Sequence, residues 1–194
     1  MTFAAGLRSI LRQDPDVISV GEIRDGETAS IAVRAAITGH LVISTLHTND
    51  AVSTISRLVD IGVEPYMISS ALRGVVSQRL VRKICPHCRK AYTPTEEEKR
   101  MVGIAENEDV TFYKGEGCQE CGRTGYRGRR GVFEILTLDA ALRREVANNA
   151  SSEELTKTAL ENGFVTMKDN CRRLVLEGVT TVAEAAKAIN SAAE

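Results

Sequence analysis

The sequence contains no long hydrophobic run and almost no net charge. No stretch of consecutive apolar side chains exceeds three residues, which excludes the hydrophobic region of a signal peptide and a membrane span of about 20 residues. The net charge is -1, so no bulk attraction to nucleic acid or to an acidic membrane is expected. We therefore expect the chain to stay in the compartment where it is made.

What is present is typical of a globular protein. The chain has 194 residues, of which 43% are hydrophobic and 26% are charged. A chain of this length can bury a real core and usually forms one domain or a domain with an appendage. The sequence shows no internal repeat and no low-complexity tract.

The first 82 residues read as an α/β segment with a parallel sheet. Apolar and arginine positions over residues 3–12 predict a helix, and apolar runs at 17–20 and 41–46 predict two strands with a helix over 29–37 between them. A strand, crossover helix and strand form a right-handed parallel unit, whose functional groups collect where the strands end. Two further helices are expected, one ending at Gly62 and one running from Pro65 toward Gln78.

Residues 83–131 read as a small inserted metal module. Two pairs of cysteines, Cys85 with Cys88 and Cys118 with Cys121, can each put two thiolates on one tetrahedral zinc ion. The 29 residues between the pairs exceed the roughly 15 to 20 of compact zinc ribbons. Redox pairs are the alternative, but two pairs complete one four-thiolate site, which favours structural zinc.

Two other possible metal ligands, His87 and Cys171, are not needed to complete the zinc site. His87 could replace a cysteine, although four thiolates already fill the coordination shell. Cys171 is expected to be a packed or idle thiol.

Residues 132–194 are predicted to form one strand, at VFEIL, followed by a helical tail. Gly163 and Gly178 are placed as helix stops. A Ser or Thr followed three residues later by Glu is a helix-start pattern, and it occurs at Thr95 with Glu98, Ser151 with Glu154, and Thr181 with Glu184.

The stretch VISVGEIRD, residues 17–25, ends an apolar strand with a carboxylate, Glu22. Nucleotide-hydrolysing folds place an acid in this way beside a γ-phosphate and its attacking water. The second strand, LVISTLH, ends with His47 near the same edge, where an imidazole could bond a phosphoryl oxygen. A surface or capping histidine is the alternative interpretation of His47.

Three ordered motifs carry a family resemblance. GLRSILRQDPD, VISVGEIRD and TGHLVISTLHTND resemble the arginine segment, Walker B box and histidine box of the bacterial secretion ATPases that drive type II secretion and type IV pilus assembly. The resemblance runs through QRLVRKICPHC and CQECGRTGYRGRRGVFEIL and covers essentially the whole chain. It implies a RecA-like C-terminal half that carries an inserted zinc-binding module and a helical C-terminal tail.

The resemblance also implies residue roles. Glu22 would polarise the attacking water, with Gly21 where other Walker B strands carry a metal-binding aspartate, and His47 would contact the terminal phosphate. The arginines that would approach nucleotide phosphates, some across a subunit boundary, are Arg8, Arg12 and Arg24. Guanidinium groups suit this role because they stabilise charge in phosphoryl transfer. A solvated helix face is the alternative for Arg8 and Arg12.

The sequence lacks the phosphate-binding loop G-x-x-x-x-G-K-[ST], since none of its fifteen glycines is followed by lysine. The family carries that loop upstream of the point where this sequence begins. We therefore expect a C-terminal piece of a longer protein, inactive alone, with residues 1–82 as the C-terminal half of the ATPase core.

The family further implies the setting of the protein. It would be part of a cytoplasmic homo-hexamer, peripheral at the inner face of the cell membrane, that hydrolyses ATP with Mg²⁺ and works against an inner-membrane platform protein of a pilus or secretion machine. The metal site would be structural Zn²⁺. The sequence does not separate secretion, pilus and DNA-uptake machines.

A zinc-finger-like module that binds nucleic acid or protein is the rival hypothesis. It rests on the basic run over residues 123–130, in which Tyr126 lies among the arginines. Because the chain as a whole is not basic and no base-reading helix is expected after the second cysteine pair, a nucleic-acid partner is not expected.

Overall fold

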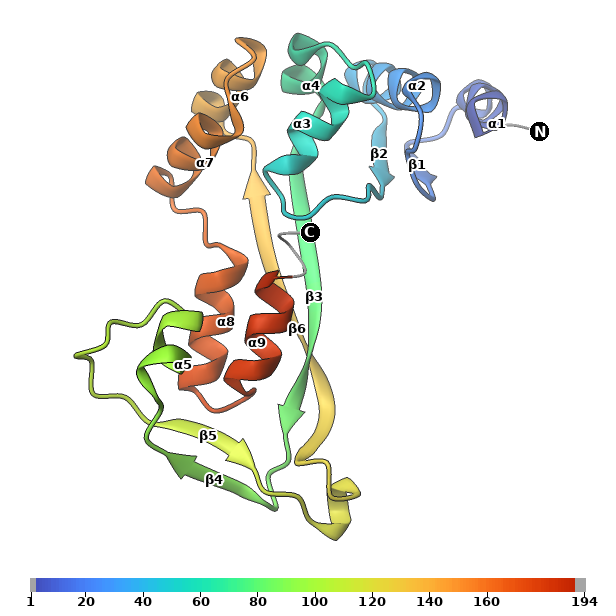
Figure 1. Ribbon diagram of the computed structural model, residues 1–194. Coiled ribbons are helices and arrows are strands. Elements are labelled where there is room, and N and C mark those ends of the chain that lie inside the picture. The colour runs from blue at the N-terminus through green and yellow to red at the C-terminus, as the bar shows by residue number, and fades with distance from the viewer. Residues whose placement is uncertain (1–2, 191–194) are drawn as a thin grey trace. The chain divides into compact units, whose positions relative to one another are not determined.

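The computed structural model describes residues 3–190, which divide into two compact units (Figure 1). Of the described residues, 3–75 and 136–164 form the first unit, and 76–135 and 165–190 form the second. Each unit is built from two separate stretches of the chain. No helix among the described residues is long and apolar enough to cross a membrane.

The first unit contains a parallel pair of strands with helices. In chain order its elements are α1 (Phe3–Ile10), a 3₁₀ turn η1 (Leu11–Gln13), β1 (Val17–Val20), α2 (Gly26–Ile37), β2 (Leu41–Ser44), α3 (Ser53–Asp60), α4 (Pro65–Ala71), α6 (Ala140–Ala147) and α7 (Ser152–Glu161). β1 and β2 are parallel, with Val17 opposite Leu41 and Val20 opposite Ser44. The predicted strand, helix, strand unit is confirmed.

Local chemistry explains where the helix between these strands begins. Asp25 is its N-cap, and the Asp25 carboxylate accepts the backbone N–H of Thr28 at 2.8 Å. One face of the helix then buries small side chains, among them Ala29, Ala32 and Ala35, in the core of this unit. The cap therefore fixes where α2 begins, directly after Arg24.

The second unit is built around the long strands β3 (Gly74–Ile84) and β6 (Tyr126–Thr137), whose ends at residues 74–75 and 136–137 belong to the first unit. β3 and β6 pair with each other and run in opposite directions (Figure 1). The other elements are β4 (Arg89–Tyr92), α5 (Glu96–Met101), β5 (Phe112–Gly115), a 3₁₀ turn η2 (Gln119–Cys121), α8 (Met167–Leu176) and α9 (Val182–Asn190). A separate core of this unit includes Val81, Phe112, Val132, Cys171 and Ala185.

The structure corrects one predicted helix. The helix that begins at Pro65 ends at Ala71 instead of continuing toward Gln78, and β3 begins at Gly74. From Gly74 to Val81 exposed and covered residues alternate, as in a strand with one covered face. Pairing with β6, more than forty residues later in the chain, decides the conformation of this segment, and no local pattern reveals that partner.

The helix-start patterns at Thr95 and Ser151 form complete capping boxes, as predicted. The pattern at Thr181 forms only one half of a box. Its hydroxyl accepts the N–H of Glu184 at 3.3 Å, but the Glu184 carboxylate binds Arg82 of β3 instead of the backbone of Thr181. Gly163 and Gly178 follow helix ends with positive φ, which confirms their role as stops.

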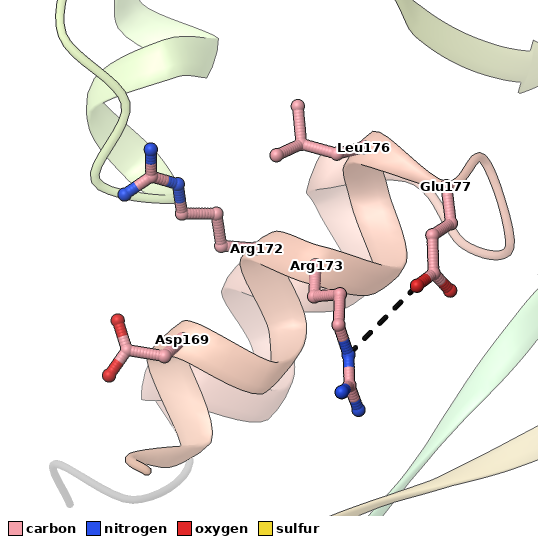
Figure 2. Close-up of a pocket in the computed structure, with 5 residues that line it drawn as sticks. All are labelled: Asp169, Arg172, Arg173, Leu176 and Glu177. Carbon is pink, nitrogen blue, oxygen red and sulfur yellow. Dashed lines mark ion pairs between the residues drawn. The ribbon is translucent and has the colours of Figure 1, made fainter. Parts of the chain in front are cut away.

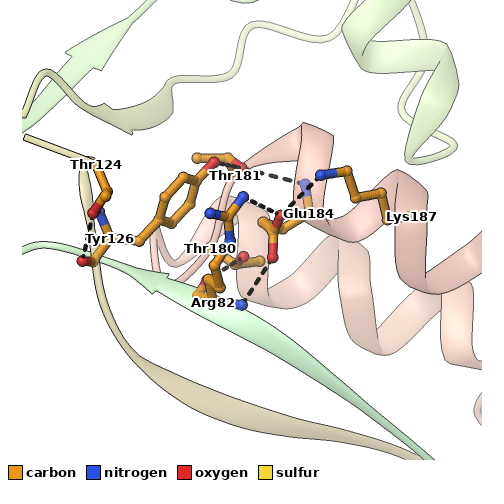
Figure 3. A network of polar contacts seen from close by, with 7 residues as sticks. All are labelled: Arg82, Thr124, Tyr126, Thr180, Thr181, Glu184 and Lys187. Atoms are coloured by element: carbon orange, nitrogen blue, oxygen red, sulfur yellow. Dashed lines mark hydrogen bonds and ion pairs between the residues drawn. The ribbon is translucent and has the colours of Figure 1, made fainter.

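Figure 3 shows the polar network around this Glu184. The Glu184 carboxylate accepts the Arg82 guanidinium at 2.7 Å and the Arg82 backbone N–H at 3.1 Å. Its side chain is 9% exposed, against 47% for Arg82. The hydrogen bond from the Arg82 side chain is the main reason why the pKa of Glu184 falls from 4.5 to about 2, against the opposing effect of burial. The network therefore ties α9 to β3 within the second unit.

We expect Glu184→Gln to destabilise the second unit by about 1–3 kcal/mol at neutral pH, because it breaks a mostly buried charged hydrogen bond. The pKa of Glu184 is depressed by folding, so the contribution is fully present above pH 4.5 and is lost as the pH falls toward 2. Urea unfolding followed by tyrosine fluorescence measures this, since Tyr92, Tyr113 and Tyr126 lie in the second unit.

The matched control is Glu177→Gln, which removes an exposed carboxylate 4.0 Å from Arg173. Such surface pairs contribute little, so the control should unfold at nearly the wild-type urea concentration. Equal midpoints for the two variants across the pH range would show that the Glu184 network does not stabilise the unit.

Candidate functional site

The carboxyl ends of β1 and β2 bring two short loops together. Gly21, Glu22 and Ile23 follow β1, and residues 45–47 follow β2. The N–H of Ile23 donates to the carbonyl of Thr45 at 3.0 Å, so the two chain segments stay adjacent beyond the last paired residues. Because the strands are parallel, this edge collects the side chains that follow both strands.

Glu22 lies at the centre of this edge. Its carboxylate binds the Arg24 guanidinium at 2.6 Å through one oxygen and the Nε2 atom of His47 at 3.3 Å through the other. The Glu22 side chain is 24% exposed, whereas those of Arg24 and His47 are 72% and 86% exposed. The carboxylate is thus partly sheltered, and its two partners reach out into solvent.

The pKa of Glu22 lies below its ordinary value. The hydrogen bond from Arg24 is the largest cause, and the hydrogen bond from His47 lowers the pKa by a smaller amount. Together these two partners outweigh partial burial, which raises the pKa. Glu22 is therefore an ionised acceptor at neutral pH. A carboxylate in this state can orient a water molecule and accept its proton.

The two arginines of the N-terminal segment are not brought to Glu22. Arg8 of α1 forms an ion pair with Glu27 of α2 at 2.8 Å, and both side chains are more than half exposed. Arg12 lies in η1 and is exposed. Among the described residues, no hydrogen bond or ion pair joins either arginine to the carboxylate at the strand tip, so their nucleotide contacts stay a prediction.

Thr45 and Thr28 are polar residues near this edge that the sequence analysis did not single out. The Thr45 hydroxyl donates to the carbonyl of Gly21 at 2.7 Å, and the Thr28 hydroxyl donates to the N-cap Asp25 at 3.0 Å. A signal for Thr45 was present, because a parallel register that pairs Val20 with Ser44 places the next residues, Gly21 and Thr45, side by side.

The second unit contains the four-cysteine cluster that the spacing predicts. The sulfur atoms of Cys85, Cys88, Cys118 and Cys121 all lie within 4.8 Å of one another. Cys85 and Cys118 are 3.9 Å apart, Cys88 and Cys121 are 3.9 Å apart, and Cys118 and Cys121 are 3.7 Å apart. Zn–S bonds of about 2.3 Å in a tetrahedron require sulfur atoms about 3.8 Å apart, so the cluster fits a zinc ion.

Backbone donors surround the sulfurs. Gly117 donates its N–H to the Cys88 sulfur at 3.3 Å, and the Cys121 sulfur accepts the N–H groups of Cys118 at 3.2 Å and Gly125 at 3.3 Å. The hydrogen bond from Cys118 is the main cause that lowers the pKa of Cys121 to about 6. Burial instead raises the pKa of Cys118 and, against the donor from Gly117, that of Cys88 to about 11, so the donors favour the metal-binding thiolate form most clearly at Cys121.

Two positions beside the cysteine cluster, Gly115 and Gly125, have no room for a side chain. A Cβ atom at Gly115 would collide with the backbone of Gly125, and a Cβ atom at Gly125 would collide with that of Gly115. Gly125 also has φ +77°, in the left-handed region. The close approach of these two backbones brings the β5 end beside the loop that follows the second cysteine pair.

Cys171 and the arginine side chains of the basic run lie outside the group of four sulfurs. Cys171 is fully buried in the core of the second unit, and burial raises its pKa to about 11, which confirms a packed thiol. Most of the basic run, from Tyr126 on, is the first part of β6, where Arg127 pairs with Glu120 at 3.1 Å. A strand thus follows the second cysteine pair directly.

A separate shallow hollow lies over α8 (Figure 2). It has a volume of about 370 Å³ and is lined by Asp169, Arg172, Arg173, Leu176 and Glu177. All five residues come from one helix and its C-terminal cap, and Arg173 pairs with Glu177 within the hollow. Because the lining comes from one helix and its cap alone, this surface makes a poor candidate for a built binding site.

Comparison with known proteins gives one consistent result. A family model described as "Type II/IV secretion system protein" matches residues 1–187. Type II secretion system protein E of Pseudomonas aeruginosa is 52% identical over 184 residues, which are 95% of this chain and 36% of that protein. Type IV pilus assembly ATPase PilB of Thermus thermophilus is 50% identical over 186 residues, 95% of this chain and 21% of that protein.

Among solved structures, the pilus retraction motor PilT with bound ADP has a TM-score of 0.66 and 32% identity, over 96% of this chain and 43% of that one. The ATPase DotB of Legionella pneumophila, at 24% identity and a TM-score of 0.65, shares the fold. The chain spans between a fifth and about a third of the length of the two curated relatives. The α/β fold and the family resemblance are confirmed, and the chain belongs to the type II/IV secretion system protein family.

Proposed function

We propose that this chain is the C-terminal part of a motor ATPase that drives type IV pilus assembly or type II secretion. The observation that carries the proposal is the group formed by Glu22, Arg24 and His47 where two parallel strands end. Membership of the family supports it, because relatives are named as type II secretion and pilus assembly ATPases.

In this proposal Glu22 acts on the attacking water. The carboxylate is ionised and partly sheltered, so it can orient a water molecule in line with the γ-phosphate and accept its proton. Phosphoryl transfer depends mainly on positioning and charge stabilisation, which such a group supplies. Glu22 is therefore the proposed catalytic residue.

The two partners of Glu22 are the proposed phosphate contacts. The His47 imidazole and the Arg24 guanidinium are both well exposed, so each can turn from the carboxylate to a phosphate oxygen. A guanidinium binds carboxylate and phosphate with the same planar donors. Arg8 and Arg12 are proposed as further phosphate contacts, some of them reaching across a subunit boundary.

The rest of the nucleotide site is proposed to lie outside this sequence. The phosphate-binding loop, with the lysine and hydroxyl that hold phosphates and Mg²⁺, has no counterpart in residues 1–194. When bound with ATP, Mg²⁺ neutralises the phosphate charge. We propose that a longer protein supplies the loop, that it assembles as a cytoplasmic homo-hexamer at the inner face of the membrane, and that it acts on a platform protein there.

The four cysteines are proposed to hold one structural Zn²⁺. The four thiolates would fill all four positions of a tetrahedral ion and would leave none open for the water or substrate that catalysis needs. The ion would join the two knuckles, at residues 85–88 and 118–121, which the chain separates by 29 residues. Its contribution is therefore to the folding of the second unit.

We expect Glu22→Gln, in the longer protein that carries the phosphate-binding loop, to keep ATP binding and to lower kcat by roughly 10²–10⁴-fold, the usual cost of losing a positioned base. His47→Ala should change both KM and kcat, because a phosphate contact acts on binding and on rate. Steady-state phosphate release measures these parameters.

The matched control is Glu161→Gln, which changes an exposed carboxylate of α7 in the same unit and should leave kcat unchanged. Residues 1–194 alone should release no phosphate above background. Full turnover by Glu22→Gln would remove Glu22 from its role, and robust turnover by residues 1–194 would contradict the missing-loop argument.

For the metal, we expect about one zinc per chain by elemental analysis and a zinc-dependent melting temperature, because unfolded thiols form no ready site and binding is coupled to folding. Cys118→Ser should lose both the metal and this dependence. Cys171→Ala, which removes a buried thiol outside the cluster, should keep its zinc. Absence of metal together with freely titrating thiols in the native protein would rule the zinc site out.

A further inference from the structure

Thr45 lies directly after β2 and holds the backbone on both sides of Glu22. Its hydroxyl donates to the carbonyl of Gly21 at 2.7 Å, and its own carbonyl accepts the N–H of Ile23 at 3.0 Å. The residue that carries the carboxylate is therefore flanked by two hydrogen bonds to the same threonine.

Only one of these bonds depends on the identity of the side chain. Any residue at position 45 can offer its carbonyl to Ile23, whereas the bond to Gly21 requires a hydroxyl donor. Thr45 is exposed, so water could satisfy its hydroxyl if the bond to Gly21 were absent. The bond from the Thr45 hydroxyl to the Gly21 carbonyl is therefore not explained by a need to satisfy a buried polar group. A role in holding the backbone beside Glu22 explains it.

Position 45 also lies close in the chain to the second partner of the carboxylate. His47 is two residues further along the same loop, and its Nε2 atom lies 3.3 Å from the Glu22 carboxylate. The threonine thus lies at the junction of the two loops that meet in this contact. On the buried side Ile23, which is 8% exposed, anchors the first loop in the core.

We infer that Thr45 is a positioning residue for ATP hydrolysis, whose hydroxyl bond to the Gly21 carbonyl fixes the Glu22 carboxylate relative to His47 and to the attacking water. This inference rests on the function proposed above. Thr45 touches neither nucleotide nor water in this role, and it acts through Glu22.

The expected effect is on rate rather than on binding. A displacement of about 1 Å in a reacting group can cost roughly 100-fold in rate. Thr45→Val keeps the shape and the branched Cβ but removes the donor, so we expect kcat to fall about 10- to 100-fold with little change in KM for ATP. Thr45→Ser keeps the donor and should retain most of the activity.

The experiment compares phosphate release by the longer protein in seven forms: wild type, Thr45→Val, Thr45→Ala, Thr45→Ser, Thr38→Val, Glu22→Gln, and the double variant Glu22→Gln with Thr45→Val. Thr38→Val is the matched control, because it removes a hydroxyl that donates to carbonyls at 3.0 Å in the same unit, at the end of α2. If Thr45 acts through Glu22, the double variant should be no slower than Glu22→Gln alone.

A second measurement follows the loop itself in residues 1–194. Amide hydrogen exchange of Ile23 should be faster in Thr45→Val than in Thr38→Val, with similar melting temperatures for the two variants. Thr45→Ala provides a second deletion of the hydroxyl, in case valine packs poorly at this position.

The outcomes separate the two proposals. Full activity of Glu22→Gln would overturn the proposed function and the inference with it. A strong loss in Glu22→Gln with unchanged kcat in both Thr45→Val and Thr45→Ala would overturn the inference alone. A loss in Thr45→Ser equal to that in Thr45→Val, or a double variant far slower than Glu22→Gln, would also contradict positioning through Glu22.

Discussion

The parallel register of β1 and β2 is the constraint on which the candidate site depends. With Val20 opposite Ser44, the residues that follow each strand emerge at one edge, and this brings the loops of Glu22 and His47 together although the two residues are 25 positions apart in the chain. A shift of one residue in this register would turn side chains to the opposite face of the sheet. The chemistry proposed for this edge therefore depends first on how β1 and β2 pair, and only then on which side chains follow the two strands.

At that edge, one carboxylate has two partners, Arg24 and His47, that we propose as phosphate contacts. Arg24 and His47 hold Glu22 ionised in the present structure, and both side chains are exposed enough to exchange it for an anion. In the proposed function, the same two side chains hold Glu22 without nucleotide and contact phosphate when it is bound. The second unit depends on a comparable local constraint, because the backbones of Gly115 and Gly125 meet where the four sulfurs converge.

Much of this arrangement could be predicted where the decisive signal is local. Short patterns predict the strand that ends at Val20, the partner strand after Gly39, and the two cysteine pairs. The rule that parallel strands end at one edge of the sheet then places Glu22 and His47 together. β3 could not be predicted in this way, because its conformation depends on pairing with β6. Likewise Thr181 begins its helix as predicted, but the Glu184 carboxylate is taken by Arg82, a residue about a hundred positions earlier.

The most direct test of the central claim is a structure of the longer protein with Mg²⁺ and a non-hydrolysable ATP analogue. The account predicts the γ-phosphate at the carboxyl end of β1 and β2, with one water molecule between it and the Glu22 carboxylate. It also predicts that the Arg24 or His47 side chain has turned from Glu22 to a phosphate oxygen. A γ-phosphate bound elsewhere, with both contacts of Glu22 unchanged, would contradict the account.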